Sequence, residues 1–338
     1  MSYKTSLVAH EKEEIREVII EGGIMTGNKL SHKKHFITFF LILIALWFGA
    51  CKGGVLPEKD LQDFRFVFAT DIHLMPDERA HEGFNRAVAA INGLKPKPHF
   101  VIMGGDLIED RFALTLEDAE KMFSLYLEAI KKLQMPVYNI IGNNEVIGRA
   151  EMSQIDPSHP EYGKGMFRER LGDGATYRSF DYGSWHFVFL DSLGEDESGD
   201  ISCYVDDDQL SWLKDELDKT GIERPVCVAL HVPLVTSFIQ IEKNNMMAPP
   251  DFAVVNNGTK VIKLLSDHNV RLILQGHLHI VEEIKYKKTS YITGGTLSGA
   301  KWSAPSYLGY PNGFVVVDVK GDEFSWKYQS YRWTLSEK

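Results

Sequence analysis

Carboxylate, imidazole and amide side chains stand in five short segments of this chain, each directly after an apolar run. The segments are Asp71-Ile72-His73, Gly105-Asp106, Gly142-Asn143-Asn144-Glu145, His231 and Gly276-His277-Leu278-His279. Oxygen and imidazole donors suit Mn, Fe or Zn better than they suit a soft-metal site. A single Asp-x-His or Gly-Asp pair is more often a polar loop or a turn. Five such segments in series predict a metal centre.

The spacing within these segments favours ligands that point the same way. Residues two apart in an extended segment project on one side, which pairs Asp71 with His73 and His277 with His279. Two metal ions about 3.5–4 Å apart can hold both the attacking and the leaving oxygen of a displacement at phosphorus. One carboxylate must then bridge the two ions. We predict that Asp106 is the bridging ligand.

The elements that must position these residues alternate between short apolar strands and helices. Strands are expected over 64–70, 100–103 and 137–141, with helices over 81–94 and 117–133 between them. This alternation predicts parallel strands joined by crossover helices. Ligands collect at the carboxyl ends of such strands, where all five segments fall.

The pattern changes after residue 141. A hairpin is expected over 176–182 and 185–190, followed by further strands and helices and by a strand-rich C-terminal part. The further elements are helices over 207–219 and 260–267 and strands over 226–230, 271–274, 282–293 and 314–331. Because no linker rich in Pro, Ser or Gly divides residues 63–338, we predict one mixed α/β domain over that range.

The five segments resemble the signature of the calcineurin-like metallophosphoesterase family, and the resemblance covers roughly residues 64–331. It implies a four-layer α/β/β/α sandwich of two facing mixed β-sheets flanked by helices. It also implies two divalent or trivalent metal ions and hydrolysis of phosphomonoesters or phosphodiesters by attack of a metal-bound hydroxide. The implied ligands are Asp71, His73, Asp106 and His279 for the first ion, and Asp106, Asn143, His231 and His277 for the second.

Three further segments resemble the branch that holds purple acid phosphatases and cyclic-nucleotide phosphodiesterases. They are residues 177–192, 209–213 and 230–234. The purple enzymes carry a tyrosine three residues after the bridging aspartate, where this chain has Glu109. A coloured iron–tyrosinate site is therefore not expected.

Asn144 is the main departure from the family motif, which reads Gly-Asn-His followed by Asp or Glu. The resemblance implies that Asp106, His231 and the residue at 144 take part directly in the reaction, with position 144 serving the leaving oxygen. Asparagine donates a hydrogen bond but transfers no proton at neutral pH, and general acid catalysis is worth typically ~10²–10⁴-fold. Glu145 would also lack the histidine that it normally orients.

Three outcomes follow from this replacement. The enzyme favours esters with good leaving groups, or His81 or His159 supplies the proton, or the chain binds metal and phosphate with little turnover. For both His81 and His159, however, we favour the interpretation as a solvated loop histidine. The last outcome would make the protein a non-catalytic surface lipoprotein with a degenerate esterase fold.

Charge and composition limit the kinds of partner. The 338 residues are 44% hydrophobic and 25% charged, which predicts a globular core, and the formal net charge is −10. Residues 1–50 hold six Lys or Arg and five Glu, so the remainder carries −11. An acidic body disfavours a nuclease, which needs a basic groove. A small phosphorylated substrate remains compatible, because bound metal ions reverse the local field.

The N-terminal region predicts an export signal. Lys33-Lys34 precede a thirteen-residue apolar run over 36–48 and then Gly49-Ala50-Cys51. The run is shorter than the roughly 20 residues that span a bilayer. The cysteine after Gly49-Ala50 resembles that of a bacterial lipobox, which implies that Cys51 is acylated. The lipid would hold the protein at the bacterial envelope and would be its one contact with the membrane. An ordinary secretory signal and an uncleaved anchor are the alternatives.

The residues on either side of this signal have different compositions. Acidic residues before Met25 suggest that Met25 is the start, and residues 51–62 have the composition of a tether.

Two other features leave alternatives open. Cys203 and Cys227 could form a disulfide in an oxidising compartment, although we favour two unpaired thiols, with Cys227 packing in a buried strand. The loop over 294–313, rich in Gly and aromatic residues, either walls a substrate pocket or packs as turns and edges.

Overall fold

The computed structural model describes residues 63–149, 152–195, 201–244 and 246–334, all within the compact unit Glu58–Lys338. The predicted leader over 1–50 and the tether over 51–62 lie outside the described residues. Among the helices in the described ranges, none is both long and apolar enough to cross a membrane.

The bounds of the strands are β1 Phe64–Ala69, β2 Phe100–Met103, β3 Val137–Asn139, β4 Arg178–Tyr182, β5 Trp185–Phe189, β6 Leu193–Glu195, β7 Ile201–Cys203, β8 Val226–Ala229, β9 Val270–Gln275, β10 Val281–Tyr286, β11 Thr289–Gly294, β12 Ser306–Tyr307, β13 Tyr310–Pro311, β14 Gly313–Lys320 and β15 Glu323–Ser330. The α-helices are α2 Glu78–Asn92, α3 Leu116–Ile130, α4 Gly165–Arg170, α5 Asp207–Thr220, α6 Phe238–Glu242 and α7 Gly258–Ser266. Two 3₁₀ turns complete them, η1 Asp110–Phe112 and η2 Asn143–Glu145.

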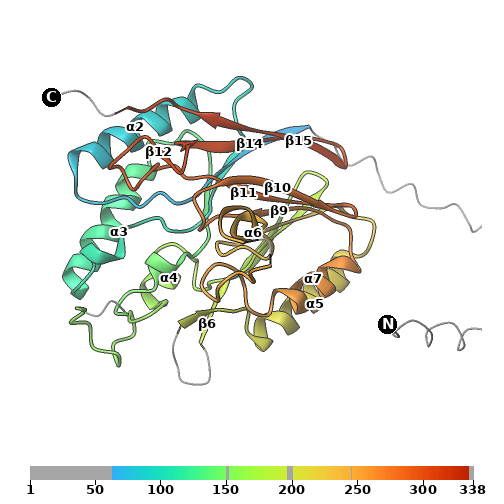
Figure 1. Ribbon diagram of the computed structural model, residues 1–338, viewed down its shortest axis with the longest axis horizontal. Coiled ribbons are helices and arrows are strands. Elements are labelled where there is room, and N and C mark those ends of the chain that lie inside the picture. The colour runs from blue at the N-terminus through green and yellow to red at the C-terminus, as the bar shows by residue number, and fades with distance from the viewer. Residues whose placement is uncertain (1–62, 150–151, 196–200, 245, 335–338) are drawn as a thin grey trace, which may run out of the picture. The chain divides into compact units, whose positions relative to one another are not determined.

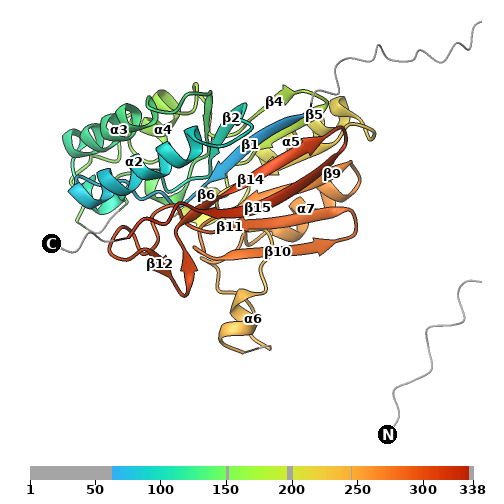
Figure 2. The same cartoon turned by 90° about the horizontal axis from the view of Figure 1, so that it is seen from above.

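Most strands belong to two large mixed sheets that face each other (Figure 1). One has the order β15-β14-β1-β2-β3, in which β1, β2 and β3 are parallel. The other has the order β10-β11-β9-β8-β5-β4, in which β5, β8, β9 and β11 are parallel. Antiparallel strands complete the edges. Figure 2 shows the strands of both sheets lying roughly along a common axis, with antiparallel neighbours such as β1 and β14 pointing opposite ways.

Alternation along the strands builds two separate cores. Phe66 and Phe68 of β1 belong to the core between the sheets, and Val67 and Ala69 to the core under the helices. Between the sheets, Phe66 stacks on Phe100 at 5.1 Å and meets Phe187 of the opposite sheet edge-on at 5.5 Å. Both faces of β1 are buried, as expected for a sheet covered on both sides.

Helices cover the outer face of each sheet (Figure 1). Phe84 and Ile91 of α2 and Phe123 of α3 pack in the core over the first sheet, while Leu213 of α5 and Leu265 of α7 do so at the second. The predicted arrangement of two facing mixed sheets flanked by helices is confirmed.

Local chemistry explains where element ends differ from expectation. The helix expected from residue 81 begins at Glu78, because the Asp77 side chain accepts hydrogen bonds from the N–H groups of Arg79 and Ala80. The strand expected to reach residue 141 ends at Asn139, whose side chain accepts a hydrogen bond from the Tyr126 hydroxyl. Cys203 and Cys227 are both free and buried, so the interpretation as unpaired thiols holds.

Candidate metal centre

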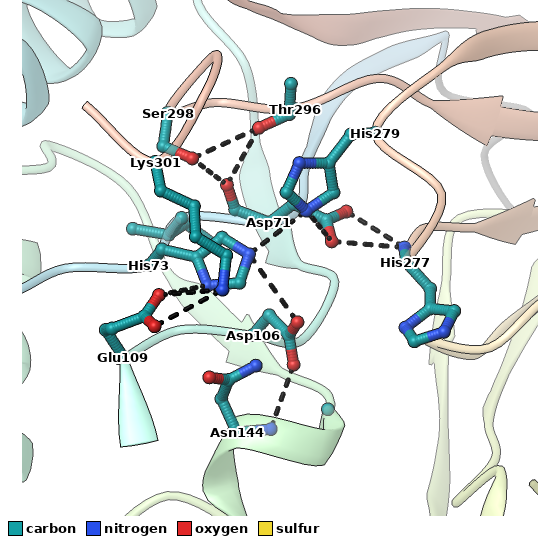
Figure 3. A network of polar contacts seen from close by, with 12 residues as sticks. Asp71, His73, Asp106, Glu109, Asn144, His277, His279, Thr296, Ser298 and Lys301 are labelled. Carbon is teal, nitrogen blue, oxygen red and sulfur yellow. Dashed lines mark hydrogen bonds and ion pairs between the residues drawn. The ribbon is translucent and has the colours of Figure 1, made fainter. Parts of the chain in front are cut away.

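The five polar segments converge at the carboxyl ends of β1, β2, β3, β8 and β9. The first group of potential ligands is Asp71, His73 and His279, whose donor atoms all lie within 4.8 Å of one another. His279 Nε2 lies 3.1 Å from Asp71 Oδ1 and 3.1 Å from His73 Nε2. His279 thus faces Asp71 and His73, as Figure 3 shows. His277 belongs to the second group, so the prediction that His277 and His279 point the same way is wrong, because the backbone at both residues has positive φ and is not extended.

The second group is Asp106, His231 and His277. Asp106 lies between the two groups: its Oδ1 is 3.3 Å from His231 Nε2, and its Oδ2 is 3.6 Å from His73 Nε2. A carboxylate with one oxygen toward each group has the placement of a bridging ligand. Asn143 lies on the cavity over the same site.

Hydrogen bonding at the predicted ligands also indicates that they could hold metal ions. Several buried side-chain atoms of the described residues lack a hydrogen-bond partner, and three of them belong to the predicted ligands of the second ion: Asn143 Oδ1, His231 Nε2 and His277 Nδ1. The other ring nitrogen of each histidine is engaged, since His231 Nδ1 donates to the Gly104 carbonyl at 2.9 Å and His277 Nε2 to the Phe252 carbonyl at 2.8 Å. This fixes the tautomer in which the remaining nitrogen offers a lone pair, the usual state of a metal-binding histidine.

The backbone at the site is held in an unfavourable conformation. Positive φ angles occur at Asp71 (57°), His73 (46°), Asp106 (50°), His277 (71°) and His279 (58°). Non-glycine residues rarely adopt this region, and such strain collects at functional sites. The Thr296 and Ser298 hydroxyls donate to the Asp71 carbonyl, and the His277 N–H donates to its carboxylate (Figure 3).

Asp106 and His231 stabilise each other's charged forms. Burial disfavours ionisation of Asp106, but the adjacent His231 imidazole outweighs it and holds the pKa of Asp106 well below its usual range. Burial also opposes protonation of His231, yet the Asp106 carboxylate raises the pKa of His231 to about 10. A metal ion would replace the proton that this pair shares.

Gly142 brings the segments after β2 and β3 together. A Cβ at this position would lie 2.2 Å from the backbone nitrogen of Asp106, which cannot move aside as a flexible side chain could.

We therefore expect Gly142→Ala to push the bridging residue out of place and to lower the free energy of unfolding by about 2–4 kcal/mol. Denaturant unfolding checks this value, and metal analysis checks the site. Gly258→Ala is the control, because φ at Gly258 is not positive and the nearest atom to a Cβ there lies at 3.4 Å, an ordinary contact. Equal effects of the two substitutions would contradict the steric argument.

Asn144 and Glu145 lie in η2 beneath the bridging carboxylate. The Asn144 N–H donates to Asp106 Oδ1 at 3.0 Å, and its side-chain Oδ1 accepts from the Asp110 N–H at 3.2 Å. The backbone donor fixes which way the amide points, leaving its amino group for a ligand in the cavity.

Glu145 has its own partners, although no histidine follows Asn143. Its carboxylate accepts backbone N–H groups from Leu107, Ile108 and Gly142 at 2.7–3.1 Å. Burial and the Asp106 charge raise the pKa of Glu145 to about 8, against these donors. Glu145 lacks the histidine that the family motif places beside it, as expected, but it ties the loops after β2 and β3 to each other.

Sequence reasoning missed the structural role of Glu109, which it noted only as the residue replacing a tyrosine. Glu109 is 3% exposed, and its Oε2 lies 3.0 Å from His73 Nδ1 and 3.0 Å from Lys301 Nζ (Figure 3). A carboxylate on Nδ1 keeps the proton there and turns Nε2 toward the site. The spacing between Asp106 and Glu109 in the sequence does not by itself indicate that Glu109 contacts His73 and Lys301.

Glu109→Gln should weaken metal binding by about 10–100-fold, the usual cost of losing such a partner to a ligand. The amide keeps the side-chain shape but loses the charge that orients His73 and Lys301. Isothermal titration of the metal-free protein with Mn²⁺ or Zn²⁺ measures the change. Glu117→Gln, at a carboxylate that is 80% exposed, is the matched control. Equal affinities in both variants would show that Glu109 plays no part.

A cavity of about 660 Å³ opens over the two groups. Asn144, Arg111 and Lys301 line it beside the ligands, and Phe238, Ile239 and Phe252 line another part of it. Neither His81 nor His159 is among the described lining residues. His81 lies instead at a separate small cavity with Leu74 and Phe84, and His159 Nδ1 accepts the Glu161 N–H. The predicted 294–313 loop contributes Ala300, Lys301, Ser303 and Tyr307 to the wall and buries Leu297 and Trp302 beneath it.

Known proteins share both sequence and fold with this chain. A 3′,5′-cyclic-nucleotide phosphodiesterase of Nostoc is 27% identical over 219 residues, which is 62% of this chain and 69% of the relative. A protein of Arcobacter nitrofigilis named "Probable glycerophosphodiester phosphodiesterase GpdQ" is 23% identical, over 64% of this chain and 70% of its own. The crystal structure of a dimetal phosphatase from Danio rerio has the same fold, with a TM-score of 0.59 and 14% identity over 79% of this chain and 96% of that chain. Residues 64–281 match the family model of the calcineurin-like phosphoesterases, so the chain belongs to that family and is a metal-dependent phosphoesterase.

Proposed function

We propose that the protein hydrolyses small phosphoesters, phosphodiesters above all, at a binuclear metal centre. The ligands would be Asp71, His73, Asp106 and His279 for one ion and Asp106, Asn143, His231 and His277 for the other. The placement of Asp106, with one carboxylate oxygen toward each ligand group, is the observation that carries this proposal. The names of the two relatives support the diester class.

The metal ions, when bound, would supply activated water and neutralise charge on the phosphoryl group. The chain's own groups would orient the substrate. Asn144 would donate its amide N–H to an oxygen of the phosphate, and Arg111 and Lys301 would add positive charge on the same wall. Because Asn144 holds no transferable proton at neutral pH, the leaving alcohol would depart without a strong general acid. We therefore expect esters with acidic leaving groups to react best.

A series of aryl phosphodiesters and monoesters with graded leaving-group pKa tests this proposal, together with metal analysis of the purified protein. A steep fall in kcat/KM as leaving-group pKa rises supports the absence of a general acid, whereas a flat series means that another group supplies the proton. Metal binding without hydrolysis of any ester would overturn the proposed activity. It would favour the alternative of a non-catalytic phosphate-binding surface protein.

We also propose that the protein is exported and anchored by a lipid on Cys51, on the pattern of residues 33–51. Cys51→Ser should move the protein from the membrane fraction to the soluble fraction and abolish acylation, as detected by mass spectrometry of the N-terminal peptide. A protein that stays in the membrane after this substitution would support an uncleaved anchor instead.

A further inference from the structure

Exposed apolar side chains are concentrated in two segments that border the cavity over the metal ligands. Within the described residues, six of the ten exposed large apolar side chains fall in two short segments, α6 to Phe252 and Tyr307-Leu308. They are Ile241, Met246, Met247, Phe252, Tyr307 and Leu308. Ile241, Met246 and Phe252 are at least 70% exposed. Apolar surface gathered in one place marks a binding site more often than isolated exposed residues do.

These segments also supply the apolar wall of the cavity over the metal ligands. Phe238, Ile239, Phe252 and Tyr307 line the same cavity as His277 and His279. The Phe252 carbonyl accepts a hydrogen bond from His277 Nε2, and the Tyr307 ring lies 5.3 Å from the His279 ring. Figure 2 shows α6 projecting from the body of the domain. The apolar wall therefore begins at the ligands themselves and continues outward onto a protruding element.

The polar part of the cavity carries positive charge. Arg111 and Lys301 line it together with Asn144, and their cationic groups lie within 3.5 Å of Glu109. The cavity thus combines cations and metal ligands with a wall of Phe238, Ile239 and Phe252, whose side chains offer no hydrogen bond. A small polar ester would leave that wall in contact with water, which is unfavourable for apolar surface.

We infer that the substrate is an amphiphilic phosphodiester, in which one alcohol carries an alkyl chain that lies along this wall while the phosphate lies at the metal centre. The inference rests on the proposed phosphodiesterase activity and specifies its substrate class. Alkyl chains gain from burial in proportion to their length, and each fully buried methylene is worth about 4-fold in binding. The inference therefore predicts that kcat/KM rises with the length of the alkyl chain.

Alkyl p-nitrophenyl phosphates with methyl, butyl and octyl chains test the inference on the metal-loaded full-length protein, below their micelle-forming concentrations. The leaving group is constant, so intrinsic reactivity changes little along the series. We expect kcat/KM to be at least about 10-fold higher for the octyl than for the methyl ester, because six or seven partly buried methylenes contribute. Phe238→Ala and Phe252→Ala should each lower this octyl-to-methyl ratio by about 3–10-fold. Ile222→Ala, exposed on the loop between α5 and β8, should leave the ratio unchanged.

Binding of methyl and octyl phosphonate, measured by calorimetry, separates this inference from the proposed activity. Hydrolysis with no chain-length dependence overturns the amphiphilic substrate and leaves the phosphoesterase intact. If no ester is hydrolysed but octyl phosphonate binds at least 10-fold more tightly than methyl phosphonate, the proposed activity is overturned and the apolar site is supported. A 3′,5′-cyclic nucleotide turned over faster than the octyl ester, with a rate that Phe252→Ala lowers, would assign the wall to a nucleobase and overturn the inference.

Discussion

Asp106→Asn should reduce phosphodiester hydrolysis by at least about 10³-fold and remove one or both metal ions. The wild-type carboxylate directs its two oxygens to two ligand groups, at 3.3 Å from His231 Nε2 and 3.6 Å from His73 Nε2. Asparagine keeps one oxygen and places an amino group, with its partial positive charge, where a cation should bind. In the proposed binuclear centre, the loss of the bridging ligand would act on both ions, which is why we expect a larger effect than at any terminal ligand.

Measurement of kcat/KM for an aryl phosphodiester, with the metal content per chain, checks this expectation. The fold should survive, since an uncharged side chain of the same shape replaces a buried carboxylate. Circular dichroism and thermal unfolding verify that survival. Asp173→Asn, at a carboxylate that is 91% exposed, is the control for the general effect of removing an acidic group. A variant that retains two metal ions and full activity would place the reaction centre elsewhere.

The position of the site could be predicted from sequence because its ligands are tied to strand ends. Runs such as Phe64–Ala69 and Phe100–Met103 are recognisable from local hydrophobicity, and parallel strands bring their carboxyl ends together whatever the details of packing. The order of polar residues along the chain was therefore enough to locate the site, although it did not show that His277 and His279 fall in different ligand groups.

The surroundings of the ligands could not be predicted in the same way. Lys301 reaches Glu109 across 192 positions, and Phe252 meets His277 through a backbone carbonyl. Such contacts depend on how loops fold back over the sheet edge, for which residue types carry little signal. Glu145 illustrates the same limit, because its three backbone donors come from two loops that converge only in the folded chain.

In the proposed mechanism, position 144 would decide how the leaving alcohol is protonated. Asn144 Oδ1 accepts the Asp110 N–H at 3.2 Å, and the residue lines the cavity over the ligands. In a histidine at this position, Nδ1 can take over the same backbone donor. That contact would fix the tautomer that carries its proton on Nε2, directed to the cavity. We therefore expect a histidine at position 144 to fit this site, where the chain carries an amide.

Asn144→His should therefore raise kcat/KM by about 10–100-fold for alkyl leaving groups, within the range that general acid catalysis supplies. It should change p-nitrophenyl esters little, because p-nitrophenolate leaves without protonation. The slope of log kcat/KM against leaving-group pKa would become shallower, which a purely structural effect would not produce. Asn144→Gln is the matched control, since it keeps an amide and adds no titratable group. If neither variant alters the slope, position 144 does not contact the leaving oxygen, and the proton must come from a group elsewhere in the cavity.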